Sequence, residues 1–295
     1  MLIAHLSDLH LRNPDDAIWL DRQLDRIAAG RPDHLAITGD LLDRWAPALL
    51  TRVLDRLAAH DFLCAQRTTI LHGNHDLASS GGHPRARADF WRLGLRFWDP
   101  PPLIHRRRRR FHHLIQARSA GVAGDAPFIK ALESGLRIAV LDTIPASWIP
   151  FTIEDRAVVL RHAVGSVPAP QAAWLASQPR AATPLVVLMH HFPVGSPSFD
   201  WRAGGRLARA PRVVVPMHVA DRDRDQFWRA AESAGVRLVL CGHVHRAGLS
   251  WQREIAVGLN GQSGAEWAGR TIAWYEITAD DVTMRLEPAG GSQNR

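Results

Sequence analysis

The chain has 295 residues, of which 46% are hydrophobic and 22% charged, so it is long and apolar enough to bury a large core. No run of about eighteen apolar residues occurs, which argues against a membrane span. The short apolar start is interrupted by Asp8 and His10 and has no basic segment typical of a signal peptide, so the expected location is the cytoplasm. Cys64 and Cys241 indicate no disulfide framework. The formal net charge of +7 comes almost wholly from arginine and favours anionic partners only weakly.

Short apolar runs alternate with amphipathic stretches through most of the chain. Helices are predicted around residues 17–27, 50–57 and 221–233, where apolar side chains recur at helical spacing or where Asp221 and Gly235 provide a start and a stop. Buried strands are predicted at Leu2–Leu6, Leu35–Thr38, Thr69–His72, Ile138–Leu141, Leu185–Met189 and Leu238–Cys241. Strands that alternate with helices in this way favour a layered α/β fold.

The C-terminal part has a different pattern. Ile255–Leu259, Thr271–Ile277 and Val282–Leu286 are predicted strands without long helices between them, and they can extend one sheet edge in antiparallel fashion. We therefore predict a single domain over residues 1–288 and a disordered tail over 289–295. Two stretches rich in Arg and Pro, about 79–135 and 195–215, are interpreted as insertions that form loops beside a site.

Side chains that can bind metals follow five of the predicted strands directly. They are Asp8 with His10, Asp40, Asn74 with His75 and Asp76, His190 with His191, and His243 with His245. Because ligands bind at the carboxyl ends of strands in an α/β sheet, these clusters are expected to converge on one crevice. Unpaired His and Asp side chains crowded into a crevice would be costly to bury without a cation.

The donor types indicate which metals fit. Carboxylates, imidazoles and one amide oxygen, without a thiolate, suit Mn²⁺, Fe, Zn²⁺ or Mg²⁺, of which Mn or Fe is preferred. There are too many donors for one catalytic ion, which usually keeps an open position. Two ions about 3.5–4 Å apart would use all of them and could clamp an in-line displacement at phosphorus.

The motifs Asp-x-His, Gly-Asp-x-x-Asp, Gly-Asn-His-Asp, His-His and Gly-His-x-His, in this order, resemble those of the calcineurin-like metallophosphoesterases over roughly residues 2–245. The resemblance implies an α-β-β-α sandwich with a strand-rich C-terminal part, cap insertions and a dinuclear metal site. It implies that the first metal is held by Asp8, His10 and His245, the second by Asn74, His190 and His243, and both by a bridging Asp40.

The same resemblance implies roles for the residues around the metals. His75 would face the scissile phosphate and assist the leaving group, and Asp76 would orient the His75 ring. Asp43 would be structural, like the glycines Gly39, Gly73 and Gly242. His191 is interpreted as a packing residue beside the site.

The resemblance implies hydrolysis of phosphate esters, and the motif details narrow the substrate. Gly-Asn-His-Asp is similar to the bacterial-type branch that includes cyclic-nucleotide phosphodiesterases, so a small-molecule phosphodiesterase is the main prediction. Protein phosphatases of the superfamily usually have Arg before a Gly-Asn-His-Glu motif, where this chain has His72. Lipid A pathway hydrolases often have Arg at the position of His75. A nuclease acting on DNA or RNA is the alternative, and a non-catalytic scaffold of the same fold is the third hypothesis.

Five consecutive arginines, Arg106–Arg110, lie within the run from His105 to His113. The run is interpreted as a solvated loop in the first insertion. Its functional alternative is a patch for nucleic acid or an anionic membrane surface. Phe111 is its only aromatic residue besides histidine, so stacking on a single strand has little support. Asp142 and Thr143, after another strand, are interpreted as caps of a turn.

Overall fold

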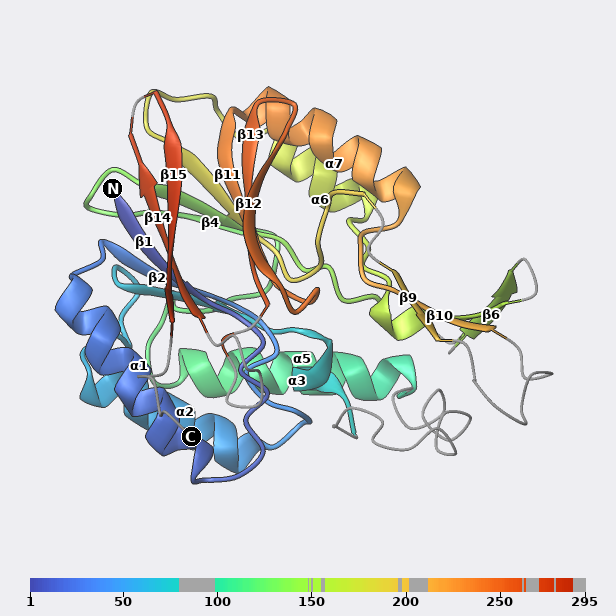
Figure 1. Cartoon of the computed structure of the whole chain (residues 1–295), viewed down its shortest axis with the longest axis horizontal. Coiled ribbons are helices and arrows are strands. Elements are labelled where there is room, and N and C mark those ends of the chain that lie inside the picture. The colour runs from blue at the N-terminus through green and yellow to red at the C-terminus, as the bar shows by residue number, and fades with distance from the viewer. Residues whose placement is uncertain are drawn as a thin grey trace.

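The computed structural model describes residues 1–79, 99–147, 149, 151–154, 157–195, 198–201, 212–261, 263, 271–278 and 280–288. Two β-sheets face each other at its centre (Figure 1). The first has the order β15-β14-β1-β2-β3, formed by β1 (Leu2–Leu6), β2 (His34–Thr38), β3 (Thr68–Leu71), β14 (Thr271–Ile277) and β15 (Val282–Pro288). β14 and β15 thus extend this sheet in antiparallel fashion, as expected. The third predicted C-terminal strand, Ile255–Leu259, was wrongly placed, because it belongs to the second sheet and pairs there with a parallel neighbour.

The second sheet has the order β12-β13-β11-β8-β5-β4. Its strands are β4 (Phe128–Ala131), β5 (Arg137–Val140), β8 (Leu185–Leu188), β11 (Val236–Cys241), β12 (Ala247–Gln252) and β13 (Ile255–Asn260). The four central strands run parallel, and β4 and β12 are antiparallel edges. Central strands buried on both faces explain the continuous apolar runs in the sequence.

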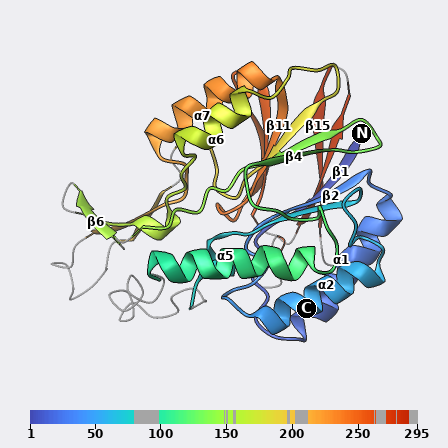
Figure 2. The ribbon, with the colours of Figure 1, turned by 180° about the vertical axis from the view of Figure 1, so that it is seen from behind.

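Helices cover the outer face of each sheet (Figures 1 and 2). α1 (Asp16–Gly30), α2 (Pro47–Ala59) and α5 (Pro101–Gln116) pack on the first sheet, and α6 (Ala169–Ala176) and α7 (Asp221–Ala234) pack on the second. In β1, Ala4 and Leu6 face the helices, whereas Ile3 faces the other sheet. The alternation of strand side chains thus builds three apolar layers between four layers of structure, the α-β-β-α sandwich that was predicted.

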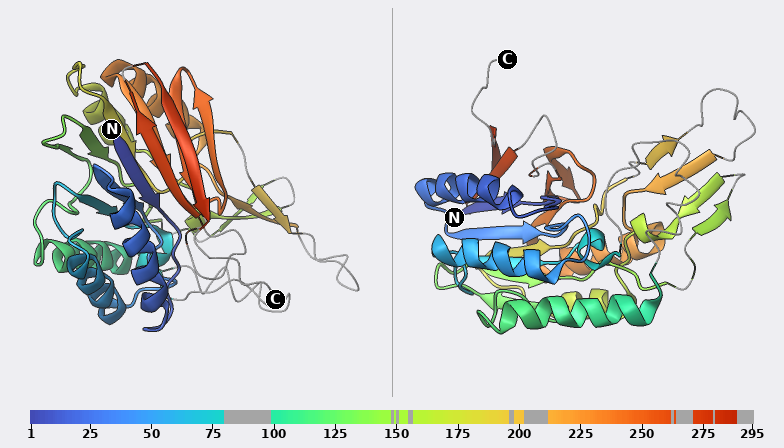
Figure 3. Two further views of the ribbon diagram at one scale, coloured as in Figure 1. Left: turned by 60° about the vertical axis from the view of Figure 1, so that its left-hand side comes forward. Right: turned by 90° about the horizontal axis from the view of Figure 1, so that it is seen from below.

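A third, smaller sheet has the order β6-β7-β10-β9. It consists of β6 (Phe151–Glu154), β7 (Ala157–Leu160), β9 (Ser198–Trp201) and β10 (Arg212–Pro216). Figures 1 and 3 show it projecting from one side of the sandwich. A strand from the predicted insertion at 195–215 therefore pairs with a strand from residues 151–160. The sequence pattern did not indicate this pairing.

The interpretation of the arginine run as a solvated loop was wrong. Residues 105–113 lie within helix α5, not in a loop, and Phe111 and Ile115 are buried in the core against the first sheet. Of the predicted insertion at 79–135, residues 80–98 lie outside the described residues, and so does the tail at 289–295. No helix among the described residues is both long and apolar enough to cross a membrane.

Candidate metal centre

The predicted metal donors all follow the carboxyl ends of strands. Asp8 and His10 follow β1, Asp40 follows β2, and Asn74 opens the short helix α3 (Asn74–Leu77) after β3. His190 follows β8, and His243 and His245 follow β11. The strands belong to two facing sheets, not to one open sheet, so the donors meet across the end of the sandwich.

The backbone is strained where it presents these donors. Five of them have positive φ angles: Asp8 at 54°, His10 at 45°, Asp40 at 50°, His243 at 69° and His245 at 53°. Residues with a Cβ rarely adopt this left-handed conformation, which costs about 1 kcal/mol or more at each position. Strain concentrated at converging polar side chains is typical of a functional site.

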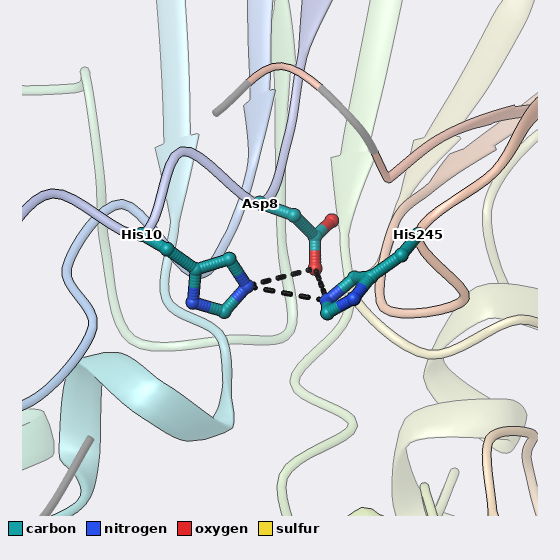
Figure 4. A group of neighbouring side chains, drawn as sticks. All are labelled: Asp8, His10 and His245. Carbon is teal, nitrogen blue, oxygen red and sulfur yellow. Dashed lines mark hydrogen bonds and ion pairs between the residues drawn. The ribbon is translucent and has the colours of Figure 1, made fainter. Parts of the chain in front are cut away.

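A first group of donors consists of Asp8, His10 and His245, whose side chains converge in Figure 4. The two imidazole Nε2 atoms are 3.2 Å apart. Asp8 Oδ1 lies 3.3 Å from Nε2 of His245 and 3.8 Å from Nε2 of His10. These atoms all lie within 4.8 Å of one another, which suits a shared cation.

A second group consists of Asp40, His190 and His243, with Asn74 beside it. His190 Nε2 lies 3.0 Å from Asn74 Oδ1 and 3.3 Å from Asp40 Oδ2. Asp40 Oδ2 is also 3.9 Å from Nε2 of His10, so this carboxylate lies between the two groups. The same oxygen is buried and accepts no hydrogen bond from the described part of the chain. An unsatisfied buried carboxylate oxygen between two donor groups fits a bridge between cations.

Hydrogen bonds to backbone carbonyls indicate where the hydrogens of two rings lie. His190 Nδ1 is 2.8 Å from the Thr38 carbonyl oxygen, and His243 Nε2 is 3.1 Å from the Ala163 carbonyl oxygen. Because a carbonyl only accepts, each of these nitrogens carries hydrogen, and the opposite nitrogen of each ring is left to bind a metal.

The electrostatics of the group favour cations. Burial is the largest single influence on the pKa of His190 and lowers it, but the Asp40 and Asp8 carboxylates and the hydrogen bond to Thr38 together raise this pKa to about 9. Burial also opposes ionisation of Asp8, yet its bonds to His10 and His245 hold the pKa of this carboxyl well below its usual range. His243 stays neutral because burial lowers its pKa to about 3. The site thus combines ionised carboxylates with a neutral imidazole ready to donate a lone pair.

The structure corrects the role expected of Asp76. Both of its carboxylate oxygens accept hydrogen bonds from backbone amides, those of Leu41, Leu42 and Gly73. The His75 ring is positioned instead by the carbonyl oxygen of Asp43, 3.0 Å from its Nδ1. The Asp76 carboxylate therefore holds the loop that carries Asp40, and the carbonyl of Asp43 contacts the His75 ring.

Several supporting contacts were not foreseen in the sequence. The Ser7 hydroxyl donates to Asp8 Oδ2 at 2.6 Å, and the His243 amide donates to the same oxygen at 2.9 Å. Thr143, expected to cap a turn, lies with its hydroxyl 2.9 Å from Nδ1 of His191. Of these supporting residues, only Ser7 could have been found from a local sequence signal, because it directly precedes the Asp-x-His motif.

The comparisons with known proteins agree with this geometry. The chain belongs to the calcineurin-like phosphoesterase family, whose model matches residues 1–247. The family identifies a metal-dependent hydrolase of phosphate esters and implies a site for two divalent cations. The donor set described above fits two such ions, because it divides into two groups joined by the unsatisfied oxygen of Asp40.

Relatives of this chain span its whole length. A cAMP/cGMP dual specificity phosphodiesterase of Mycobacterium tuberculosis is 24% identical over 326 residues, covering 99% of this chain and 80% of the relative. A dimetal phosphatase from Danio rerio superposes with a TM-score of 0.57 at 13% identity, over 98% of this chain and 96% of the other. The Thermus thermophilus protein TT1561 superposes with a TM-score of 0.51 at 13% identity, over 97% and 98% of the two chains. These two structures show a shared fold.

Proposed function

We propose that the chain is a phosphodiesterase that hydrolyses a small-molecule diester, such as a cyclic nucleotide. The observation that carries the proposal is the complete set of donors gathered at one end of the sandwich, with His75 beside it. The similarity to a cAMP/cGMP phosphodiesterase supports a diester substrate.

The donors are proposed to act as two sets. Asp8, His10 and His245 hold one cation and Asn74, His190 and His243 hold the other, while Asp40 contacts both. When bound, two divalent cations lower the pKa of a water molecule and offset the negative charge of the phosphate. Imidazole, carboxylate and amide donors favour Mn²⁺ or Fe as the resident ions.

His75 is proposed to assist the leaving group. Its ring packs edge to face against His10, with centroids 4.6 Å apart, and it forms a group with His10 and Asp40. The Asp43 carbonyl oxygen lies 3.0 Å from Nδ1, and Nε2 is the ring nitrogen that is proposed to meet substrate. A proton on Nε2 can pass to the departing alkoxide oxygen, a step that typically contributes about 10²–10⁴-fold to the rate.

The experiment that tests the proposal compares a diester with a monoester. Hydrolysis of bis-p-nitrophenyl phosphate, p-nitrophenyl phosphate and cyclic AMP would be measured with Mn²⁺ and again after chelation. We expect chelator-sensitive cleavage with preference for the diesters. Preference for the monoester would contradict the proposed substrate class. Cleavage of an oligonucleotide in place of cyclic AMP would favour the nuclease alternative.

A further inference from the structure

Helix α5 has two unlike faces. Its sequence, PPLIHRRRRRFHHLIQ, contains five arginines and three histidines and has no acidic residue. Phe111, His112 and Ile115 are buried on the face toward the core. Arg106, Arg109 and Arg110 are exposed on the other face, so the helix presents a row of cations to the outside.

Two of the five arginines are neutralised by the fold. Arg107 Nη1 lies 2.8 Å from Asp99 Oδ2 and donates to the Leu77 carbonyl oxygen at 2.7 Å. Arg108 Nε lies 2.8 Å from Asp142 Oδ2, and its Nη2 donates to the Ile144 carbonyl oxygen. These contacts tie α5 to the loops around the metal centre, and they account for Arg107 and Arg108 structurally.

The other three arginines have no such partner in the part of the chain that the structure describes. Among the described residues, no acidic side chain pairs with Arg106, Arg109 or Arg110. Arg109 and Arg110 stand three and four positions after Arg106, the spacings at which side chains on a helix are neighbours. Like charges at these spacings destabilise a helix. A bound anion would remove that repulsion.

These side chains line a cavity of about 750 Å³. Its wall is formed by Trp45, Pro47, Leu103, Arg106, Arg107, Arg109, Arg110 and His113. The volume lies within the range of about 300–1,000 Å³ that is usual for small-ligand sites. Helix α2 begins at Pro47, so the positive end of its dipole also borders the cavity.

We propose that this cavity binds a nucleoside polyphosphate. The guanidinium groups of Arg106, Arg109 and Arg110 would hold the phosphates through paired, charge-assisted hydrogen bonds, and Trp45 would stack on the base. A hollow of this volume fits one nucleotide better than a flat bilayer surface, and its single aromatic wall residue besides His113 suits one base, not a strand of them.

The cavity is separate from the metal centre but adjoins it. None of the residues that line it is a proposed metal donor. Trp45 stands two residues after Asp43, which orients His75, and its amide donates to the Ala78 carbonyl oxygen at 2.8 Å. Binding there can thus be measured without metals and without turnover, so the proposal stands or falls independently of the proposed phosphodiesterase activity.

The test is a titration of chelator-treated, metal-free protein with ATP by calorimetry at low salt. We expect one ATP per chain, and affinity that falls as salt is raised. The variant Arg106→Gln/Arg109→Gln/Arg110→Gln should bind at least about tenfold more weakly, the effect of losing about 1.4 kcal/mol. The matched control Arg22→Gln/Arg222→Gln/Arg229→Gln removes the same charge from exposed positions elsewhere and should bind as the unmodified chain does.

Each contrary result has a defined meaning. If both triple variants lost ATP affinity equally, the binding would depend only on net charge, and the proposed site would be wrong. The absence of ATP binding at low salt would also overturn the site. Trp45→Leu should weaken ATP more than inorganic tripolyphosphate, and equal effects on the two would overturn the role of the base. The unmodified chain could instead fail to bind ATP but bind anionic phosphatidylglycerol vesicles or a single-stranded oligonucleotide, with that binding lost in the Arg106→Gln/Arg109→Gln/Arg110→Gln variant. This result would show that the arginines bind a membrane surface or a nucleic acid strand and would overturn the nucleotide proposal. A thermal melt of each variant confirms that it is folded.

Discussion

The two groups of donors in the metal centre are supported in different ways. In the first group, side chains share the positioning with the backbone: Ser7 donates to Asp8 beside the His243 amide, and the Asp43 carboxylate lies 3.8 Å from Nδ1 of His10. In the second group, the rings of His190 and His243 bond to backbone carbonyls. The first group can therefore be tuned by single substitutions, whereas the second depends on where the loops lie.

The largest effect is expected from Asp40→Ala, because Asp40 lies between the two groups. Its loss also removes the acceptor of the His75 amide, which donates to Asp40 Oδ1 at 2.8 Å. We expect both metals to be lost and turnover of the best substrate to fall by about 10³-fold or more. Metal content by mass spectrometry and hydrolysis of bis-p-nitrophenyl phosphate measure the two effects. Two metals retained per chain would show that neither group needs the shared carboxylate.

The next largest effect is expected from His75→Ala, which belongs to neither group of proposed ligands. Both metals should stay bound, because the seven proposed donors are intact, while kcat falls by about 10²–10⁴-fold. A substrate with a good leaving group, such as a p-nitrophenyl ester, should lose less than cyclic AMP does, since p-nitrophenolate needs less protonation. Unchanged turnover of cyclic AMP would refute the role of His75, and loss of metal would make it a ligand.

The sandwich could be predicted from the sequence because its central strands are continuous apolar runs. β1 and β14 were predicted with the bounds that they have in the structure, since both faces of each strand are buried. Helix α5 was missed because its outer face is rich in arginine, and few of its apolar side chains, among them Phe111, Leu114 and Ile115, pack against the core. The small sheet was missed because β7 and β10 pair across more than fifty residues.

The metal donors could be predicted because the signal for them is local in sequence, whereas the residues that position the donors could not be predicted. Each donor follows its strand within a few residues, so a short motif contains it. The carbonyl that fixes His243 comes from Ala163, 80 residues earlier, and no sequence motif reports such a contact. The resemblance implied that Asp76 orients His75, but adjacent residues in a helical turn such as α3 point in different directions.

The substitution Gly165→Ala is expected to displace the loop that positions His243 in the second group of donors. A Cβ at Gly165 would lie 2.4 Å from the Cβ and Cγ of His191, and that ring packs 4.3 Å from the ring of His243. The segment holding the Ala163 carbonyl must then shift, so we expect the second metal to bind about 10–100-fold more weakly and the first to be little changed. Anomalous diffraction from crystals grown in limiting Mn²⁺ identifies which group is occupied.

The control for this loop variant is Gly248→Ala in β12, where an added Cβ has no heavy atom within 4 Å. It should keep both affinities. If Gly165→Ala weakened both metals equally, the two groups would be one cooperative unit, and the contrast between carbonyl and side-chain support would have no energetic meaning.

The smallest effect is expected from Ser7→Ala, which removes one side-chain support from the first group. Asp8 Oδ2 keeps the hydrogen bond from the His243 amide at 2.9 Å, so we expect only about tenfold weaker binding of the first metal and no change in the second. Ser263→Ala is the matched control, since it removes a buried hydroxyl that accepts from the Ser7 amide but does not contact Asp8. Calorimetric Mn²⁺ titrations of both variants separate the two sites. If Ser263→Ala weakened binding of the first metal equally, the position of the loop that carries Asp8 would set the metal affinity of this group too, and the hydrogen bond from the Ser7 hydroxyl would not.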